Sequence, residues 1–315
     1  MSEVEQLTHL PGKPVELTVW HDGLAFATES EVVGLSLPEG ETRSYPIAKK
    51  ESMWSLTSTP HGSHLYGVGE KNLYVWDRET CEVVWQSSND NYVGQLAVDA
   101  PEKLLLACND TEVFVLKAAD GKTHKKVSLH NYSDDAATKA VWLPGHKKFA
   151  VINVNKLIWF SQAAANKKRL GQVSFRYYSV FWDVAASPDG VHVAGLIDPC
   201  GGGDGYKVNV WNLETQKMTI RLRWKDCADF YPSTITYTPD GSQLLVAGDP
   251  KEQSWFTFWD TSTGKRMKRT LPFHTELGPE MASMQVHPDG ESLFGLCREE
   301  SGRKTSSTLW RWDLT

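Results

Sequence analysis

Residues 237–249 read YTPDGSQLLVAGD, a turn signal followed by an apolar run. The same Pro-Asp-Gly phrase returns at 188–190 and 288–290, each time before another apolar stretch. Proline fixes φ near the value that the second residue of a tight turn requires, and Asp and Gly tolerate the conformations that follow. The phrase therefore predicts a strand, a sharp turn and a second strand, and its regular return indicates a repeat.

A second phrase follows each turn, an apolar strand that ends in an aromatic residue and often an Asp or Asn. It is clearest as LYVWD at 73–77, VNVWN at 208–212, FTFWD at 256–260 and LWRWD at 309–313. The Trp position of the phrase is occupied in successive units by Leu35, Trp76, Leu116, Phe160, Trp211, Trp259 and Trp312. Seven units with four short, alternating strands each account for the chain and leave little room for helices.

These turns and strand ends resemble the WD40-repeat β-propellers over essentially the whole chain. The resemblance implies an all-β fold, a seven-bladed β-propeller of four-stranded antiparallel blades, with residues 1–315 as a single WD40-like domain. The last unit stops at 313–315 after its third strand, whereas residues 5–10 precede the first unit as a spare strand. We therefore expect the N-terminal strand 5–10 to join the C-terminal blade and close the propeller.

Composition limits the partners and the compartment. The net charge is −6 and no long Lys/Arg run occurs, so nucleic acid is not expected as a partner. The first ten residues, MSEVEQLTHL, do not form a secretory signal, and apolar runs such as LLLAC at 104–108 are too short to span a membrane. Five scattered cysteines without a CxxC motif favour a reduced, cytoplasmic protein.

Motifs for chemistry are weak. Gly121-Lys122-Thr123 lacks the earlier glycine of a phosphate loop, and no GxSxG sequence is present. His61 and His64 are spaced like metal ligands, but no third ligand is identifiable, so we interpret the stretch as a turn with a polar His at the start of the following strand. The glycine-rich run 198–205 is interpreted as a flexible link, with an anion-binding nest as the alternative. We predict no cofactor, no metal and no catalytic residue.

Aromatic and arginine residues gather in the segments that link successive units. Such residues dominate the energetics of protein interfaces. We predict a partner-binding surface made by Tyr132, Arg176, Tyr177, Tyr178, Trp182, Trp224 and Phe230. Trp182 and Trp54 occupy equivalent positions on first strands, where core packing is the favoured interpretation and the mouth of the central channel is the alternative.

The family resemblance implies a non-catalytic scaffold or adaptor that binds protein or peptide partners through its face loops. The alternative is a propeller enzyme, a hydrolase or an oxidoreductase, or a binder of a small ligand or peptide at the central channel. An enzyme site there needs several convergent polar groups. The first strands offer only Asp183 and Gln285 besides small hydroxyls, which favours the scaffold.

Overall fold

Short antiparallel strands make up the regular structure of the chain. The structure is a computed structural model, and it describes residues 4–38, 40–88, 95–109, 111–129, 137–153, 155–162, 169–174, 180–198, 206–223, 230–250, 256–269, 271, 280–301 and 304–315. In these residues the strands form seven antiparallel sheets, which confirms the predicted all-β, seven-bladed propeller. Within the same ranges, no helix is long and apolar enough to cross a bilayer.

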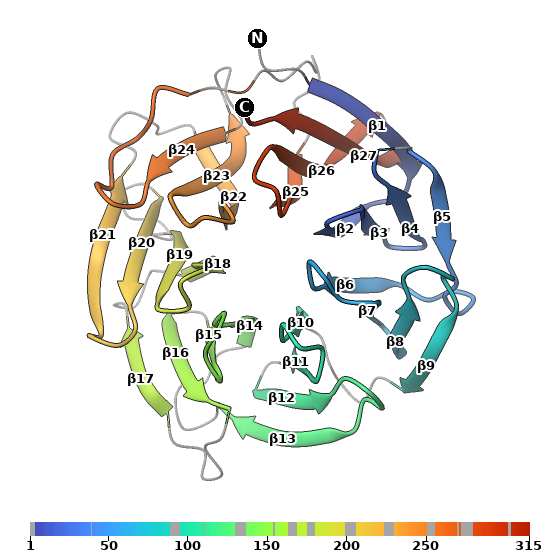
Figure 1. The fold of residues 1–315 in the computed structure, drawn as a ribbon, viewed down its shortest axis with the longest axis horizontal. Helices are drawn as coiled ribbons and strands as arrows, with labels where there is room; N and C mark the ends of the chain where they lie inside the picture. Colours follow the sequence, from blue (N-terminus) through green and yellow to red (C-terminus); the bar gives the residue numbers. More distant parts are fainter. Residues whose placement is uncertain are drawn as a thin grey trace. The chain divides into compact units, whose positions relative to one another are not determined.

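The structure divides into two compact units, the first comprising Met1–Ala107, Phe114–Lys125 and Pro272–Thr315. The first unit contains blades 1, 2 and 7 and most of blade 3 (Figure 1). Blade 1 consists of β2 (Pro14–Trp20), β3 (Gly23–Thr28), β4 (Val32–Ser36) and β5 (Thr42–Tyr45). Blade 2 consists of β6 (Met53–Ser58), β7 (His64–Gly69), β8 (Asn72–Asp77) and β9 (Val83–Ser88). Blade 3 consists of β10 (Ala97–Val98), β11 (Leu104–Cys108), β12 (Glu112–Lys117) and β13 (Thr123–Ser128), and blade 7 of β25 (Glu280–Val286), β26 (Ser292–Ser301), β27 (Lys304–Asp313) and β1 (Val4–Pro11).

The second unit comprises Cys108–Val113 and Lys126–Leu271. Blade 4 consists of β14 (Ala137–Trp142), β15 (Lys148–Asn153), β16 (Lys156–Ser161) and β17 (Arg169–Ser174). Blade 5 consists of β18 (Val180–Ala186), β19 (His192–Asp198), β20 (Lys207–Asn212) and β21 (Lys217–Arg223). Blade 6 has three strands in the described residues, β22 (Phe230–Tyr237), β23 (Gln243–Pro250) and β24 (Phe256–Asp260). An isolated bridge between Trp259 and Arg266 lies where its fourth strand was expected.

Burial differs between the middle and outer strands of a blade. The third strands β8, β12, β16 and β20 each bury four consecutive residues, whereas the outer strand β9 exposes most of its side chains. Middle strands are covered on both faces, so they bury consecutive side chains, most of them apolar, rather than alternate ones. The expected alternation was therefore wrong for these strands. The seven Trp-equivalent residues are all buried, with exposed fractions of 0–6%.

The Asp or Asn that follows the aromatic residue caps the turn after the third strand. In blade 6, Asp260 Oδ1 accepts bonds from the backbone N–H groups of Ser262 and Thr263 at 2.9 and 2.7 Å, and also from both of their hydroxyls. Asn212 makes the same backbone contacts in blade 5, to Glu214 and Thr215 at 3.0 and 2.9 Å. The residue type is thus explained locally, because Asx side chains bond to backbone groups two and three residues ahead.

The N-terminal strand completes the last blade, as predicted. Strand β1 pairs antiparallel with β27, from Val4 opposite Trp312 to Pro11 opposite Ser306, and Figure 1 shows the two strands side by side. Leu7 and Leu10 pack against a buried cluster that contains residues of blades 1 and 7. The two ends of the chain are therefore joined by a backbone ladder and by apolar contacts.

Deleting residues 1–10 is expected to destabilise the first unit by on the order of 3 kcal/mol or more, because ladder bonds and two partly buried leucines are lost. Thermal unfolding followed by circular dichroism measures this loss. A synthetic peptide of residues 1–12 added in trans should restore part of the melting temperature. An unchanged melting temperature in the deletion variant would contradict the closure by β1.

The cap at Asp260 predicts a pH effect. The Ser262 hydroxyl and then the Thr263 backbone N–H lower the pKa of Asp260 to about 2. A depressed pKa in the folded state stabilises the fold above the unfolded pKa of about 4, and this contribution is lost as the pH falls through the folded pKa. The wild type should therefore lose more of its melting temperature between pH 4 and pH 2 than the variant Asp260→Asn. Equal losses in the two proteins would refute the role of this carboxylate.

Candidate functional site

A β-bulge recurs in the first strand of six blades in the described residues. The residue after each bulge is polar, and these residues are Glu16, Ser55, Lys139, Asp183, Thr234 and Ser283. A bulge adds one residue to a strand and changes the direction of the neighbouring side chains. The shared position suggests a shared role, which the hydrogen bonds at Asp183 and Ser55 make explicit.

In the second unit, Asp183 connects the first strands of three blades. Its Oδ1 lies 2.5 Å from Lys139 Nζ of blade 4, and its Oδ2 accepts bonds from Thr234 Oγ1 at 3.0 Å and Ile235 N at 2.8 Å in blade 6. The residue is 3% exposed, and Oδ1 also accepts the N–H of Val184. Buried carboxylates need such partners. Asp183 therefore holds blades 4, 5 and 6 together.

In the first unit, Gln285 and Ser55 make comparable contacts. Gln285 Oε1 accepts the N–H of Val19 at 3.1 Å, and its Nε2 donates to the carbonyl of Leu17 at 2.9 Å, which joins blade 7 to blade 1. Ser55 Oγ donates to Glu16 Oε2 at 3.1 Å, which joins blade 2 to blade 1. Asp183 and Gln285, the two larger polar residues that the sequence placed on first strands, thus both make hydrogen bonds between blades.

The predicted partner surface lies largely beyond the described part of the chain. Tyr132, Arg176, Tyr177, Tyr178 and Trp224 fall outside the described residues. Phe230 begins β22, where its backbone pairs with Pro250. Among the seven predicted residues, Trp182 is therefore the one whose side chain can be placed. The glycine-rich run likewise falls outside the described residues after Asp198.

Trp182 and Trp54 are surface residues, so the favoured interpretation of core packing was wrong. Trp182 is 59% exposed and Trp54 is 36% exposed. Each lies inside a bulge, and in blade 5 the neighbours Phe181 and Asp183 are buried at 1% and 3%. The extra residue of a bulge has no partner across the ladder. Its side chain is therefore displaced from the position that strict alternation assigns to it.

The histidines belong to turns that contact one another. The His61 ring lies against His21 of blade 1 with centroids 4.4 Å apart and a tilt of 32°, whereas His64 Nδ1 lies 3.3 Å from Glu102 Oε2 of blade 3. The two histidines of the HGSH stretch thus have different neighbours, and His64 begins strand β7, which agrees with the interpretation of a turn followed by a strand. In the described ranges, no three His, Cys, Asp or Glu side chains are grouped as metal ligands.

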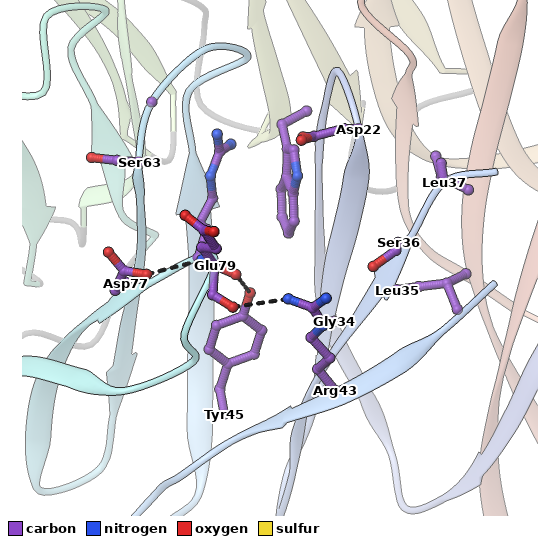
Figure 2. Close-up of a pocket in the computed structure, with 13 residues that line it drawn as sticks. Asp22, Gly34, Leu35, Ser36, Leu37, Arg43, Tyr45, Ser63, Asp77 and Glu79 are labelled. Carbon is purple, nitrogen blue, oxygen red and sulfur yellow. Dashed lines mark hydrogen bonds between the residues drawn. The ribbon is translucent and has the colours of Figure 1, made fainter. Parts of the chain in front are cut away.

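A groove of about 620 Å³ opens between blades 1 and 2. Figure 2 shows Arg43 and Tyr45 of blade 1 reaching toward the turn of blade 2 that carries Glu79. Arg43 Nη1 donates to the Glu79 carbonyl at 2.8 Å, and the Tyr45 hydroxyl donates to the Arg78 carbonyl at 3.2 Å. Burial raises the pKa of Tyr45 above its usual range, so the phenol remains a donor.

Arg78 and Trp20 form the wall of this groove. The Arg78 guanidinium lies 4.7 Å from the centroid of the Trp20 ring, and its Nη1 donates to the carbonyl of Thr59 at 3.1 Å. Burial lowers the pKa of Arg78, and the carboxylates of Asp22 and Glu102 oppose that effect. A guanidinium on an indole face is a stable, partly desolvated cation.

Sequence reasoning missed these groove residues. Two signals were present: Trp20 opens the turn WHDG, where blade 2 has Thr59, and Arg78 directly follows the Trp-Asp pair of blade 2. Neither signal indicates that Trp20 and Arg78 contact each other, because the two residues lie 58 positions apart in two different blades. Only the packing of the two sheets brings the indole under the guanidinium.

Comparison with known proteins adds little. No family model matches the sequence. A stretch of 93 residues is 31% identical to Protein RBL of Arabidopsis thaliana. This match covers 28% of the chain and 16% of that relative's length, so the chain spans a small part of the curated protein that it matches. Membership of the WD40 family stays a prediction.

Replacing Asp183 by Ala tests its role between blades. The change leaves Lys139 without its carboxylate and the Ile235 N–H without its acceptor. Removing one partner of a buried pair costs about 3–5 kcal/mol, so we expect a loss of that order in chemical denaturation. The variant Asp189→Ala, which alters a turn carboxylate of the same blade, should cost less. A loss below about 1 kcal/mol for Asp183→Ala would contradict the assigned role.

Proposed function

We propose that the protein is a non-catalytic interaction scaffold that binds a segment of a partner protein in the groove between blades 1 and 2. The observation that carries the proposal is the groove itself, open to solvent and walled by Trp20, Tyr45, Arg43 and Arg78. Tryptophan, tyrosine and arginine are the residues that contribute most to binding energy at protein interfaces. Because Trp20 and Tyr45 are 6% and 2% exposed, the two aromatic rings form the buried base of the wall, and Arg43, with a 42% exposed side chain, offers donors and charge at its surface.

The contacts of Asp183 and Gln285 support a scaffold over the enzyme alternative. Both residues were the polar groups available for chemistry at the central channel, and both are engaged in bonds between blades. Trp182 is 59% exposed beside Asp183, which makes a small-ligand or peptide contact at that tryptophan the second candidate. The carboxylate beside it would contribute charge only by giving up Lys139 or the N–H of Ile235.

We also propose a WD40-like, cytoplasmic protein whose partners are proteins or peptides rather than nucleic acid or membrane. The Asp and Asn caps after the Trp-equivalent residues support the WD40-like assignment. The unpaired thiols of Cys81, Cys108 and Cys297 suit a reducing compartment. The net charge of −6 does not favour contact with phosphate-rich surfaces.

Site-specific photo-crosslinking tests the groove. Benzoylphenylalanine is introduced at Ser36, which lines the groove, and at Met218, a 41% exposed residue of blade 5. We expect one protein to be crosslinked in native lysate from position 36 and not from position 218. The additional change Arg43→Glu should reduce that product several-fold. Equal crosslinking from both positions, or none from position 36, would overturn the assignment.

A further inference from the structure

The contact between blades 1 and 2 has a counterpart between blades 2 and 3. Arg78 lies two residues after Trp76, and Ala118 lies two residues after the equivalent Leu116. Arg78 N donates to Ser63 O at 2.9 Å, and Ala118 N donates to Lys103 O at the same distance. The two turns are therefore equivalent in backbone structure, but one carries a guanidinium and the other a methyl group.

The outer strands of blades 1 and 2 each supply an aromatic donor to these turns, although the two residues differ in register. Tyr45 lies opposite Val32, three residues before Leu35, and Trp85 lies opposite Val75, one residue before Trp76. Tyr45 of blade 1 donates to the carbonyl of Arg78, and Trp85 Nε1 of blade 2 donates to the carbonyl of Ala118 at 2.9 Å. Gly121 leaves room for the Trp85 ring, because a Cβ at that position would lie 2.7 Å from the ring. The indole is thus fixed in orientation before any partner arrives.

At the first contact Arg78 lies on Trp20 beside the groove of about 620 Å³, whereas at the second contact the methyl group of Ala118 lines a pocket of about 280 Å³. Its walls include Val84, Trp85 and Tyr66, and Val84 is 51% exposed at the rim. The volume lies just below the range of about 300–1,000 Å³ that is typical of small-molecule sites. A pocket of this size suits one long side chain.

The charge of this pocket is negative. Its lining contains Glu102 and no lysine or arginine among the described residues. Burial, and next the carboxylates of Glu102 and Asp99, raise the pKa of Tyr66, so both carboxylates act on the interior of the pocket. His64 and Tyr66 are the other titratable lining residues, and His64 Nδ1 lies 3.3 Å from Glu102 Oε2. In the neighbouring groove, Arg78 interacts electrostatically with Asp22, Glu102 and Asp77.

Glu102 occupies a strained backbone position. Its φ is 51°, and its N–H bonds to Asp99 O as the N–H of Gly190, Gly241 and Gly290 bonds three residues back in the other turns. Those glycines have φ of 67–79°. A non-glycine residue in this region costs on the order of 1 kcal/mol. At this position the Glu102 carboxylate accepts a hydrogen bond from Ser63 N at 3.1 Å, at the edge of the pocket.

We propose that the pocket between blades 2 and 3 binds a lysine or arginine side chain of a partner peptide. The aliphatic stem lies along Val84 and Ala118, and the cationic end lies between the Trp85 and Tyr66 rings and the Glu102 carboxylate. The protein's own Arg78, held on Trp20 beside Asp22, is the internal precedent for this arrangement. The assignment deepens the proposed function by naming the chemistry of a second contact.

Titration of the folded protein with short peptides tests the pocket without the natural partner. The probes are Ac-Ala-Arg-Ala-NH2 and Ac-Ala-Lys-Ala-NH2, with norleucine and citrulline peptides as uncharged controls. The readout is the indole N–H signal of Trp85 in a nitrogen–proton correlation spectrum, assigned with the variant Trp85→Phe. We expect a basic peptide to shift this signal in a saturable manner and to bind at least about tenfold more tightly than the norleucine peptide.

Two variants of Glu102 separate binding from folding. Glu102→Gln keeps an acceptor for Ser63 N and removes the charge, and Glu102→Gly relieves the left-handed strain and removes the side chain. Both should keep the wild-type melting temperature within a few degrees and lose at least about tenfold in affinity. The matched control Glu5→Gln, on exposed β1, should bind as the wild type does.

Several outcomes would overturn the proposal. They are equal binding of the norleucine and basic peptides, undiminished binding by folded Glu102→Gln, and the absence of any Trp85 shift at saturating peptide. These results are independent of the photo-crosslinking at Ser36. Failure of the crosslinking at Ser36 would count against the groove as a binding site, whereas failure of the peptide titration would count against the pocket between blades 2 and 3.

Discussion

Mutual coverage of neighbouring sheets is the constraint on which this structure depends. The middle strands of each blade are apolar on both faces, so a blade cannot be buried by its own residues. In the first unit, Trp76 and Tyr74 of blade 2 share a buried cluster with Trp20 and Ala25 of blade 1. In the second unit, Trp211 of blade 5 packs with residues of blade 4. Burial of apolar area supplies most of the stabilisation, and the repeat exists because each unit needs a neighbour.

Polar contacts then fix how neighbouring blades meet. Apolar packing is non-directional, whereas a hydrogen bond needs a defined distance and angle. The bulged first strands supply such contacts at one shared position, with Asp183 in the second unit and Ser55 in the first as clear cases. Because these bonds join a side chain of one blade to another blade, they set the alignment of successive first strands. The same use explains why polar residues on first strands are weak evidence for catalysis here.

The candidate sites arise where a regular contact between blades is varied. Blades 1 and 2 place Arg78 on Trp20, and blades 2 and 3 place Ala118 beside Trp85 instead. The two turns make the same backbone hydrogen bond, so residues 78 and 118 place different side chains, a guanidinium and a methyl group, at equivalent points beside the two spaces. Glu102, at a left-handed turn position that glycine holds elsewhere, adds charge to the open space. Because the fold repeats, the contact between blades 1 and 2 can be compared residue by residue with the contact between blades 2 and 3.

The sequence by itself determined the repeat, the all-β fold, the place of each third strand and the strand that completes the last blade. Local chemistry carries these features, because turn residues, Asp caps and apolar runs act within a few positions along the chain. It misjudged Trp182 and Trp54, since a bulge shifts a side chain without a clear mark in the sequence. The tertiary structure alone decided the groove and the pocket. Trp20 with Arg78, and Tyr66 and Trp85 with Glu102, lie on different blades, and no local pattern records which surfaces the packing of two sheets will bring together.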